Sequence, residues 1–175
     1  SIWMRILKQF SNTVLWIFEG NRFSRKNIIS FAEKFGVSEE RLIFAQKAIL
    51  SEHLERHQHI DIFLDTFKCN AHTTASDAIW SGVPIVTLEG ETFCARVASS
   101  ILKSVGLNEL VATSELEYEE KIIELIVSPE KLKFIKEQIS PVNRSSLDLF
   151  NPKNFTQNLE KVFNDLIQKH SVIGI

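Results

Sequence analysis

The fold of this chain is decided by residues 60–84, which read IDIFLDTFKCNAHTTASDAIWSGVP. The apolar run Ile60–Leu64 predicts a buried strand. A polar loop follows, and Thr73–Ser81 then has the composition of a helix that ends at Gly82. The first backbone N–H groups of a helix have no intrahelical acceptor and lie at the positive end of its dipole. We therefore expect an anion such as a phosphate to bind where this helix begins.

The side chains at the start of this helix indicate what the anion belongs to. Thr73 and Thr74 add hydroxyl groups to the backbone donors. Asp77 lies four residues after Thr73, on the same helix face at roughly 5–6 Å, and its carboxylate suits the hydroxyl groups of a ribose. A nucleoside diphosphate is the ligand that this pattern predicts. The alternative is that Thr73 only caps a core helix and Asp77 faces solvent, and residue types alone do not decide between the two.

Length and composition indicate one soluble globular domain. The chain has 175 residues, of which 44% are hydrophobic and 24% charged. The formal net charge of −2, with no basic stripe, argues against a nucleic-acid partner, and no apolar run is long enough to span a membrane. Cys69 and Cys94 stand in unrelated contexts with no secretory signal, which predicts free thiols and a cytoplasmic location.

Strands and helices alternate along the first two thirds of the chain. Apolar runs predict strands at Val14–Phe18, Arg41–Phe44, Ile60–Leu64, Pro84–Leu88 and Leu110–Ala112. Helices are predicted between them at Ser24–Phe35, Thr73–Ser81 and Thr92–Val105, each ending at a glycine. This order indicates an α/β fold, a Rossmann-like parallel sheet with helices on both faces, in which ligands bind at the carboxyl ends of the strands.

The two ends of the chain depart from this alternation. Extra helices are predicted at Glu115–Val127, Pro129–Ile139 and Pro152–Lys169, packed on the sheet or on a partner. Ile2–Phe10 reads as an amphipathic helix with no strand before it. Because such a start is unusual for a complete fold of this kind, we expect residues 1–175 to form one domain of a longer protein.

The sequence closely resembles the C-terminal catalytic half of the O-GlcNAc transferase and Spindly-like family, glycosyltransferase family 41. The resemblance is carried by LDTFKCNAHTTASDAIWSGVPIVT at residues 64–87 and GETFCARVASS at residues 90–100. It continues in order through NTVLWI at 12–17, RLIF at 41–44, Glu52, His53, Tyr118 and the tail from Asn151 to Leu159. The resemblance implies the second, nucleotide-sugar-binding Rossmann-like half of a GT-B fold, with its first strand and the N-terminal half absent from this chain. In the family, the two halves are usually preceded by tetratricopeptide (TPR) repeats.

The resemblance also implies a set of nucleotide-sugar-binding residues. His72, Thr73 and Thr74 would hold the diphosphate, Asp77 the ribose, and Cys69 would line the same pocket. The uracil would be held by the residues Lys47, Ala48, His53 and Arg56. One departure is Leu50, because the family's O-GlcNAc transferases often have a lysine there that reaches the ribose.

By this resemblance, the whole enzyme would transfer N-acetylglucosamine from UDP-GlcNAc to a protein Ser or Thr hydroxyl with inversion. It needs no metal or other cofactor, since helix-end amides and a lysine take up the charge on UDP. That lysine and an acceptor-side histidine lie outside this chain, so no catalytic residue is expected here, and the fragment alone is expected to be inactive. Two alternatives stay open: a Spindly-like transferase that uses GDP-fucose, and a scaffold with a vestigial nucleotide site.

Three further groups of residues are given structural roles. His53, His57 and His59 are not expected to bind a metal, because no third ligand stands at a suitable spacing. Trp3, Trp16 and Trp80 are expected in the core, since each lies in an apolar run. Arg96 is expected either to pair with Glu91 or to contact another part of the enzyme, and the pairing is favoured.

Overall fold

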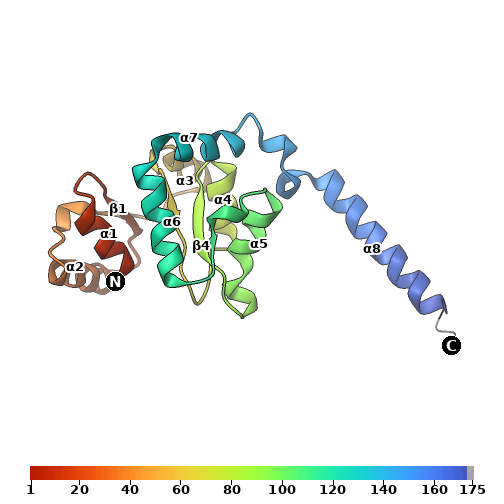
Figure 1. The fold of residues 1–175 in the computed structure, drawn as a ribbon, viewed down its shortest axis with the longest axis horizontal. Coiled ribbons are helices and arrows are strands. Elements are labelled where there is room, and N and C mark those ends of the chain that lie inside the picture. The colour runs from red at the N-terminus through yellow and green to blue at the C-terminus, as the bar shows by residue number, and fades with distance from the viewer. Residues whose placement is uncertain (173–175) are drawn as a thin grey trace. The chain divides into compact units, whose positions relative to one another are not determined.

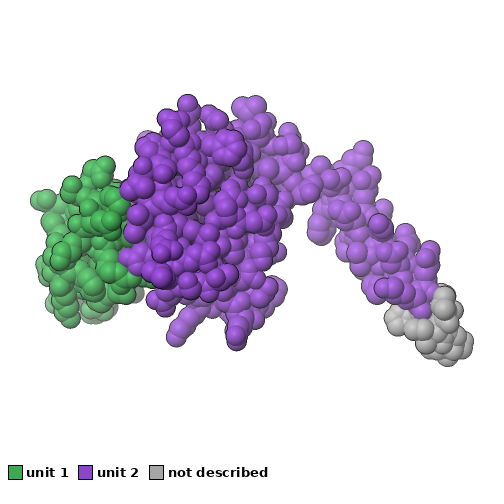
Figure 2. Space-filling view, in the orientation of Figure 1, with its two compact units in different colours: residues 1–55 green, residues 56–175 purple. Residues whose placement is uncertain are grey.

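The computed structural model describes residues 1–172. The chain divides into two compact units, Ser1–Glu55 and Arg56–Ile175 (Figure 2). The hydrogen-bonded strands form two parallel sheets, one within each unit, which confirms the predicted parallel α/β architecture.

The first unit is built on two parallel strands. Its elements are α1 (Ile2–Gln9), β1 (Leu15–Phe18), α2 (Arg22–Lys34), the 3-10 helix η1 (Glu39–Arg41), β2 (Leu42–Ala45) and α3 (Leu50–Arg56), whose last residue begins the second unit. Strand β1 pairs with β2 from Leu15 opposite Leu42 to Phe18 opposite Ala45. The Arg41 guanidinium donates to the carbonyls of Leu7 at 3.1 Å and Phe10 at 2.7 Å, so it satisfies groups that the end of α1 leaves open.

The second unit contains a three-stranded parallel sheet in the order β3 (Phe63–Leu64), β4 (Ile85–Leu88), β5 (Val111–Ala112). Its helices are α4 (Thr73–Trp80), α5 (Val97–Ser104), α6 (Glu115–Val127), α7 (Pro129–Gln138) and α8 (Pro152–Val172), with five short 3-10 helices at His57–His59, Phe93–Ala95, Asn108–Leu110, Arg144–Ser146 and Asp148–Phe150. Figure 1 shows the central strand β4 with α6 on one side and α4 and α5 on the other. The sheet is therefore covered on both faces, as the sequence predicted.

The buried side chains of the second unit follow from its sequence pattern. Ile85 and Val86 of β4 are fully buried between the helices. Ala75, Ala78 and Ile79 form the buried face of α4, at the spacing expected for one side of a helix. Helix α6 packs on β4 and β5, and α7 packs on α6, whereas α8 exposes many of its apolar side chains.

The predicted elements agree with the structure to within a few residues at most positions. All five strands are confirmed, and the span of α6 is the one predicted. The predicted helix ends at Gly36, Gly82 and Gly106 are also confirmed, and the φ of +79° at Gly82 is a backbone conformation that favours glycine. The stretch Thr92–Val105 is broken into a 3-10 turn and α5, and α3 was not among the predicted helices. No helix among residues 1–172 has the length and apolar character needed to cross a membrane.

The prediction that Trp80 belongs to the core is wrong. Trp80 is 39% exposed, because it falls outside the buried face of α4 formed by Ala75, Ala78 and Ile79. Its ring is covered in part by the Arg144 guanidinium, 3.7 Å from the ring centroid. The edge-to-face partner of Trp80 is Phe150, at 5.0 Å between centroids. Trp80 thus attaches the segment before α8 to the outer side of α4.

The start of α6 is fixed by reciprocal hydrogen bonds. Ser114 Oγ accepts from the Glu117 N–H at 3.1 Å. A Glu117 carboxylate oxygen accepts from both the backbone N–H and the hydroxyl of Thr113, each at 2.7 Å. The hydrogen bond from the Thr113 backbone, together with that hydroxyl and Lys121, lowers the pKa of Glu117 from 4.5 to about 2.

We expect the stability difference between the wild type and Glu117→Gln to depend on pH. Because the folded-state pKa of Glu117 lies below its unfolded value, its stabilising contribution is present above pH 4.5 and is lost as the pH falls towards about 2. The wild type should therefore have the higher urea midpoint at neutral pH, and the gap should close across that window. Glu120→Gln, at an exposed position of the same helix, is the control. A gap that stays constant down to pH 2 would contradict this assignment.

Candidate functional site

The loop between β3 and α4 is held in place by the buried carboxylate of Asp65. Asp65 follows β3 directly and is 1% exposed. One carboxylate oxygen accepts from the backbone N–H groups of Thr66 at 2.8 Å and Ala71 at 2.7 Å. The other oxygen accepts from the Thr87 hydroxyl of β4 at 2.6 Å. Asp65 therefore joins both ends of the loop to the neighbouring strand.

The electrostatics of Asp65 show the cost of this arrangement. Burial raises the pKa of its carboxyl above the ordinary value of 3.8. The hydrogen bonds from Thr87, Ala71 and Thr66 act in the opposite direction, as does the nearby imidazole of His72. The loss of hydration outweighs these four contributions, so the pKa stays raised and the buried carboxylate carries a net desolvation cost.

Two further side chains close the same loop. Tyr118 of α6 is fully buried, and its hydroxyl donates to the Asp65 carbonyl at 3.0 Å. Its ring meets Phe67 edge-to-face at 4.9 Å between centroids. The Asn70 side-chain amide donates to the Thr66 carbonyl at 2.8 Å. The loop is thus supported from α6 as well as from β4.

The first turn of α4 lies directly after this loop and faces solvent. His72 is the N-cap residue, and its side chain makes no capping hydrogen bond. The N–H groups of Ala75 and Ser76 donate to the His72 carbonyl at 3.1 and 3.2 Å. Thr73 is therefore the first residue of the helix and does not cap it. His72, Thr73 and Thr74 are all exposed, so the donors at this end of α4 are accessible to a ligand.

The loop between β4 and α5 lies against the loop between β3 and α4. The Asn70 N–H donates to the Cys94 carbonyl at 2.8 Å, and the Gly90 N–H donates to the Ala95 carbonyl at the same distance. Phe93 is 84% exposed, and its ring stands edge-to-face to the His72 ring at 6.4 Å between centroids. An exposed aromatic ring therefore stands beside the start of α4.

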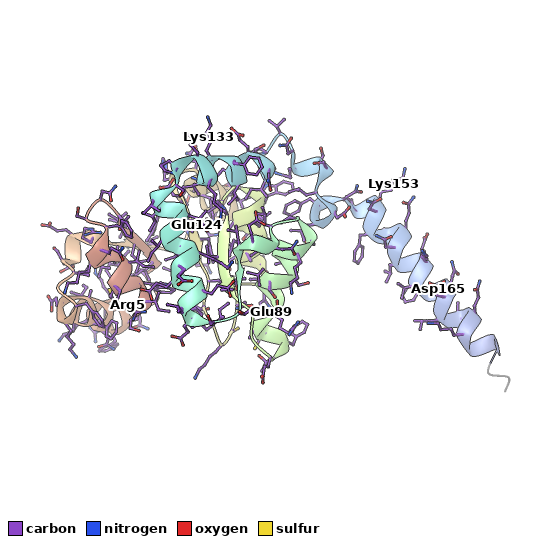
Figure 3. The ribbon with its side chains drawn as sticks, viewed as in Figure 1. Arg5, Glu89, Glu124, Lys133, Lys153 and Asp165 are labelled. Carbon is purple, nitrogen blue, oxygen red and sulfur yellow. The ribbon has the colours of Figure 1, made fainter. Side chains whose placement is uncertain are left out.

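The predicted pairing of Arg96 with Glu91 is wrong, because the partner of Arg96 is Glu89. The distance from Arg96 Nη2 to a Glu89 carboxylate oxygen is 2.5 Å, and Lys103 Nζ lies 2.5 Å from the other oxygen. The hydrogen bond from Lys103 is the main cause of the lowered pKa of Glu89, which directly follows β4 and is labelled in Figure 3. Because Glu89 directly follows the strand, it is held closer to α5 than Glu91, which lies in the exposed loop.

The structure brings together five of the predicted binding residues. Cys69, His72, Thr73, Thr74 and Asp77 follow one another along the loop and the first turns of α4 in the second unit. All of them are exposed except Asp77, which is half-buried.

The other four predicted residues lie elsewhere in the chain. Lys47 and Ala48 belong to the loop after β2, and His53 belongs to α3, all in the first unit. Arg56 ends α3 and begins the second unit. Leu50, where the resemblance leads us to expect a lysine, is 64% exposed at the start of α3.

The sequence analysis gave no role in the site to Asp65, Asn70 or Phe93. An aspartate directly after a buried strand was a signal that could have identified Asp65. Its partner Thr87 lies on the next strand, and only the sheet pairing brings the two together. Cys69 and Cys94 are free thiols, as predicted. The fold also brings their loops together, since both neighbours of Cys69 bond to Cys94.

Comparison with known proteins decides the family. The sequence model of glycosyl transferase family 41 matches residues 1–159. This chain belongs to glycosyltransferase family 41. The family assignment agrees with the resemblance found at residues 64–87 and 90–100 and with the parallel α/β fold.

Relatives within glycosyltransferase family 41 align along nearly all of the chain. The probable UDP-N-acetylglucosamine–peptide N-acetylglucosaminyltransferase SEC of Arabidopsis thaliana is 33% identical over 96% of this chain, and the Caenorhabditis elegans UDP-N-acetylglucosamine–peptide N-acetylglucosaminyltransferase is 30% identical over 97%. A solved structure of a point mutant of the Thermobaculum terrenum O-GlcNAc transferase superposes on 93% of the chain with a TM-score of 0.84 and 29% identity, which supports the GT-B assignment. The chain spans 17% and 15% of the two relatives and 32% of the solved chain.

We expect Asp65→Ala to destabilise the protein by about 3–4 kcal/mol, because three donors lose their acceptor and two of them are backbone N–H groups. Thr87→Val is the matched control. It removes a single hydroxyl donor and should cost roughly 1–2 kcal/mol. Urea denaturation monitored by circular dichroism measures both values. Equal losses in the two variants would show that the loop amides do not depend on Asp65.

Proposed function

We propose that this chain is the donor-binding half of a protein O-GlcNAc transferase, which transfers N-acetylglucosamine from UDP-GlcNAc to Ser and Thr hydroxyls with inversion. The observation that carries the proposal is the exposed start of α4, which His72 does not cap with its side chain, in a member of glycosyltransferase family 41. Relatives that align along almost the whole chain are named as peptide N-acetylglucosaminyltransferases.

The diphosphate of the donor would bind at the start of α4. Thr73 and Thr74, which carry backbone N–H groups and hydroxyls, are exposed there, and His72 directly precedes them as the N-cap residue. As the bond between the anomeric carbon and UDP breaks, negative charge develops on the diphosphate. Donors already fixed in place stabilise this charge without reorganising, which lowers the barrier to attack by the acceptor hydroxyl. These groups supply the charge stabilisation for which other transferases use a metal ion.

The remaining parts of the donor would be held by the other predicted residues. Asp77 lies one helical turn after Thr73 on α4 and would accept hydrogen bonds from the ribose hydroxyls. Cys69 would line the pocket beside the diphosphate. Uracil would be held by the main chain at Lys47 and Ala48 and by the side chains of His53 and Arg56.

The rest of the transferase would be supplied by other parts of a longer polypeptide. An N-terminal catalytic half and TPR repeats would bring the acceptor protein to the sugar, and the catalytic groups would come from that half. The whole protein would work in the cytoplasm. This division is consistent with a chain that spans 17% of the length of its Arabidopsis thaliana relative.

A transferase that uses a guanine nucleotide is the second candidate. The probable UDP-N-acetylglucosamine–peptide N-acetylglucosaminyltransferase SPINDLY of Petunia hybrida is 31% identical over 83% of the chain, although its name also describes a UDP-N-acetylglucosamine-dependent activity. Leu50 favours this candidate, because a ribose contact of the family's O-GlcNAc transferases is absent or made differently there.

We expect calorimetric titration to show that the chain binds UDP and that GDP does not compete. Asp77→Ala should weaken UDP binding about 10- to 100-fold, the effect of losing a hydrogen bond to a charged acceptor. Asp165→Ala, at an exposed helical position of α8 (Figure 3), is the matched control and should leave the affinity unchanged. Preference for GDP would instead indicate the second candidate, a transferase that uses a guanine nucleotide. Absence of binding to either nucleotide would overturn the donor-binding role of this chain.

A further inference from the structure

The two cysteines of the chain, far apart in sequence, are neighbours in the fold. Cys94 Sγ donates to the Lys68 carbonyl at 3.3 Å. The Asn70 N–H donates to the Cys94 carbonyl at 2.8 Å. Cys69 therefore lies between two residues that both bond to Cys94. Lys68 accepts through its carbonyl, and Asn70 donates through its backbone N–H.

The backbones of the two cysteines come close to each other. A disulfide requires Cα atoms about 4.4–6.8 Å apart. The Asn70 N–H belongs to the peptide group that joins Cys69 to Asn70, and this group contacts the Cys94 carbonyl directly. The sulfur atoms are held only weakly. Cys69 Sγ lies 3.8 Å from the Asn70 carbonyl and Cys94 Sγ lies 3.4 Å from the Thr92 hydroxyl, and thiols are weak hydrogen-bond donors. Side-chain rotation towards a partner thus breaks no strong contact.

Both thiols are available for reaction. They are unpaired in this structure, with Cys69 exposed and Cys94 partly exposed. The loops that carry them follow the adjacent parallel strands β3 and β4, and each loop is anchored separately. Asp65 and Tyr118 hold the first loop, and the Gly90–Ala95 hydrogen bond holds the second. The anchors fix the two cysteines beside each other while their side chains stay free to turn.

We propose that Cys69 and Cys94 are a modification site, a dithiol that closes reversibly to a disulfide between the two loops. Glutathione disulfide is the oxidant. The Cys69 thiolate attacks one sulfur of glutathione disulfide and releases one glutathione thiolate, leaving a mixed disulfide on Cys69. The Cys94 thiolate then attacks the Cys69 sulfur and releases the second glutathione. The two cysteines lose two electrons and two protons, and one glutathione disulfide becomes two glutathione molecules.

The bridge would act on the site described above, and this part of the inference rests on the proposed function. Closing it turns the Cys69 side chain away from the pocket that it would line and fixes it to the loop that carries Phe93. Phe93 and His72 already stand ring to ring across these loops. Oxidation therefore displaces groups beside the diphosphate site, and UDP affinity should fall several-fold.

The sequence permits a direct test for the bridge. Trypsin cuts after Lys68 and Arg96 and nowhere between them, so both cysteines fall within one peptide, residues 69–96. The reduced protein is incubated with glutathione disulfide, and the remaining thiols are blocked with iodoacetamide. After trypsin digestion, the mass of the peptide is measured by mass spectrometry. The wild-type peptide should be lighter by two hydrogen atoms than the unblocked reduced peptide and should carry neither glutathione nor the blocking group. Cys69→Ser and Cys94→Ser should each yield a glutathione adduct or a blocked thiol instead.

The outcomes separate this inference from the proposed function. A wild-type peptide that carries glutathione on both cysteines, or links between two protein molecules, would overturn the disulfide. UDP titration of oxidised and reduced protein then tests the coupling, and treatment of the oxidised protein with dithiothreitol is the control that should restore the affinity. A bridge with unchanged UDP affinity would overturn the coupling alone. Failure of the reduced protein to bind UDP would refute the proposed function, while the peptide mass would still decide the disulfide.

Discussion

The hydrogen bonds of the buried Asp65 carboxylate are the constraint on which the site depends. The chain leaves β3 and must turn through an exposed polar loop before α4 begins. Asp65 ties the beginning and end of that loop to each other and to β4. Burial raises the pKa of this carboxyl, so burying its charged form is unfavourable. Its hydrogen bonds nevertheless fix the position of the helix start, which an apolar residue could not do.

The topology of the sheet brings a second loop to the same place. Strands β3 and β4 are adjacent and parallel, so the segments that follow them leave from one edge of the sheet. In the β4–α5 loop, the Cys94 carbonyl accordingly accepts a hydrogen bond from the Asn70 N–H, and the Phe93 ring lies beside the His72 ring. The exposed donors lie in the first turn of α4, and the aromatic ring and both thiols lie in the two loops, whereas the core behind them is apolar. The chemistry is carried by short segments whose positions are set by the core.

The sequence was a reliable guide wherever a local pattern determines structure. The five strands and the helix ends at Gly36, Gly82 and Gly106 were predicted correctly, because hydrophobic periodicity and the positive φ at a helix end are local properties. The helix start at Thr73 was predicted correctly for the same reason. Whether Thr73 caps that helix was left open by residue types, and the structure assigns the cap position to His72.

Features that depend on tertiary contacts were missed or predicted wrongly. The exposure of Trp80 follows from which face of α4 meets the sheet, and its partners Arg144 and Phe150 come from a distant segment. The role of Asp65 requires the register of β3 against β4. The proximity of Cys69 and Cys94 needs both loops in place. These contacts join residues that are distant in sequence, so no short stretch of sequence can predict them.

The support given to the loop by Asp65 and Tyr118 bears on how mutational screens of such enzymes are interpreted. Neither side chain is accessible to a ligand, since Asp65 is 1% exposed and Tyr118 is fully buried. A screen scored only by catalytic turnover would nevertheless group both with the donor-binding residues, because displacing the loop disables the same step as removing a contact. Scoring protein abundance beside turnover would separate residues that touch the nucleotide from residues that hold the loop in shape.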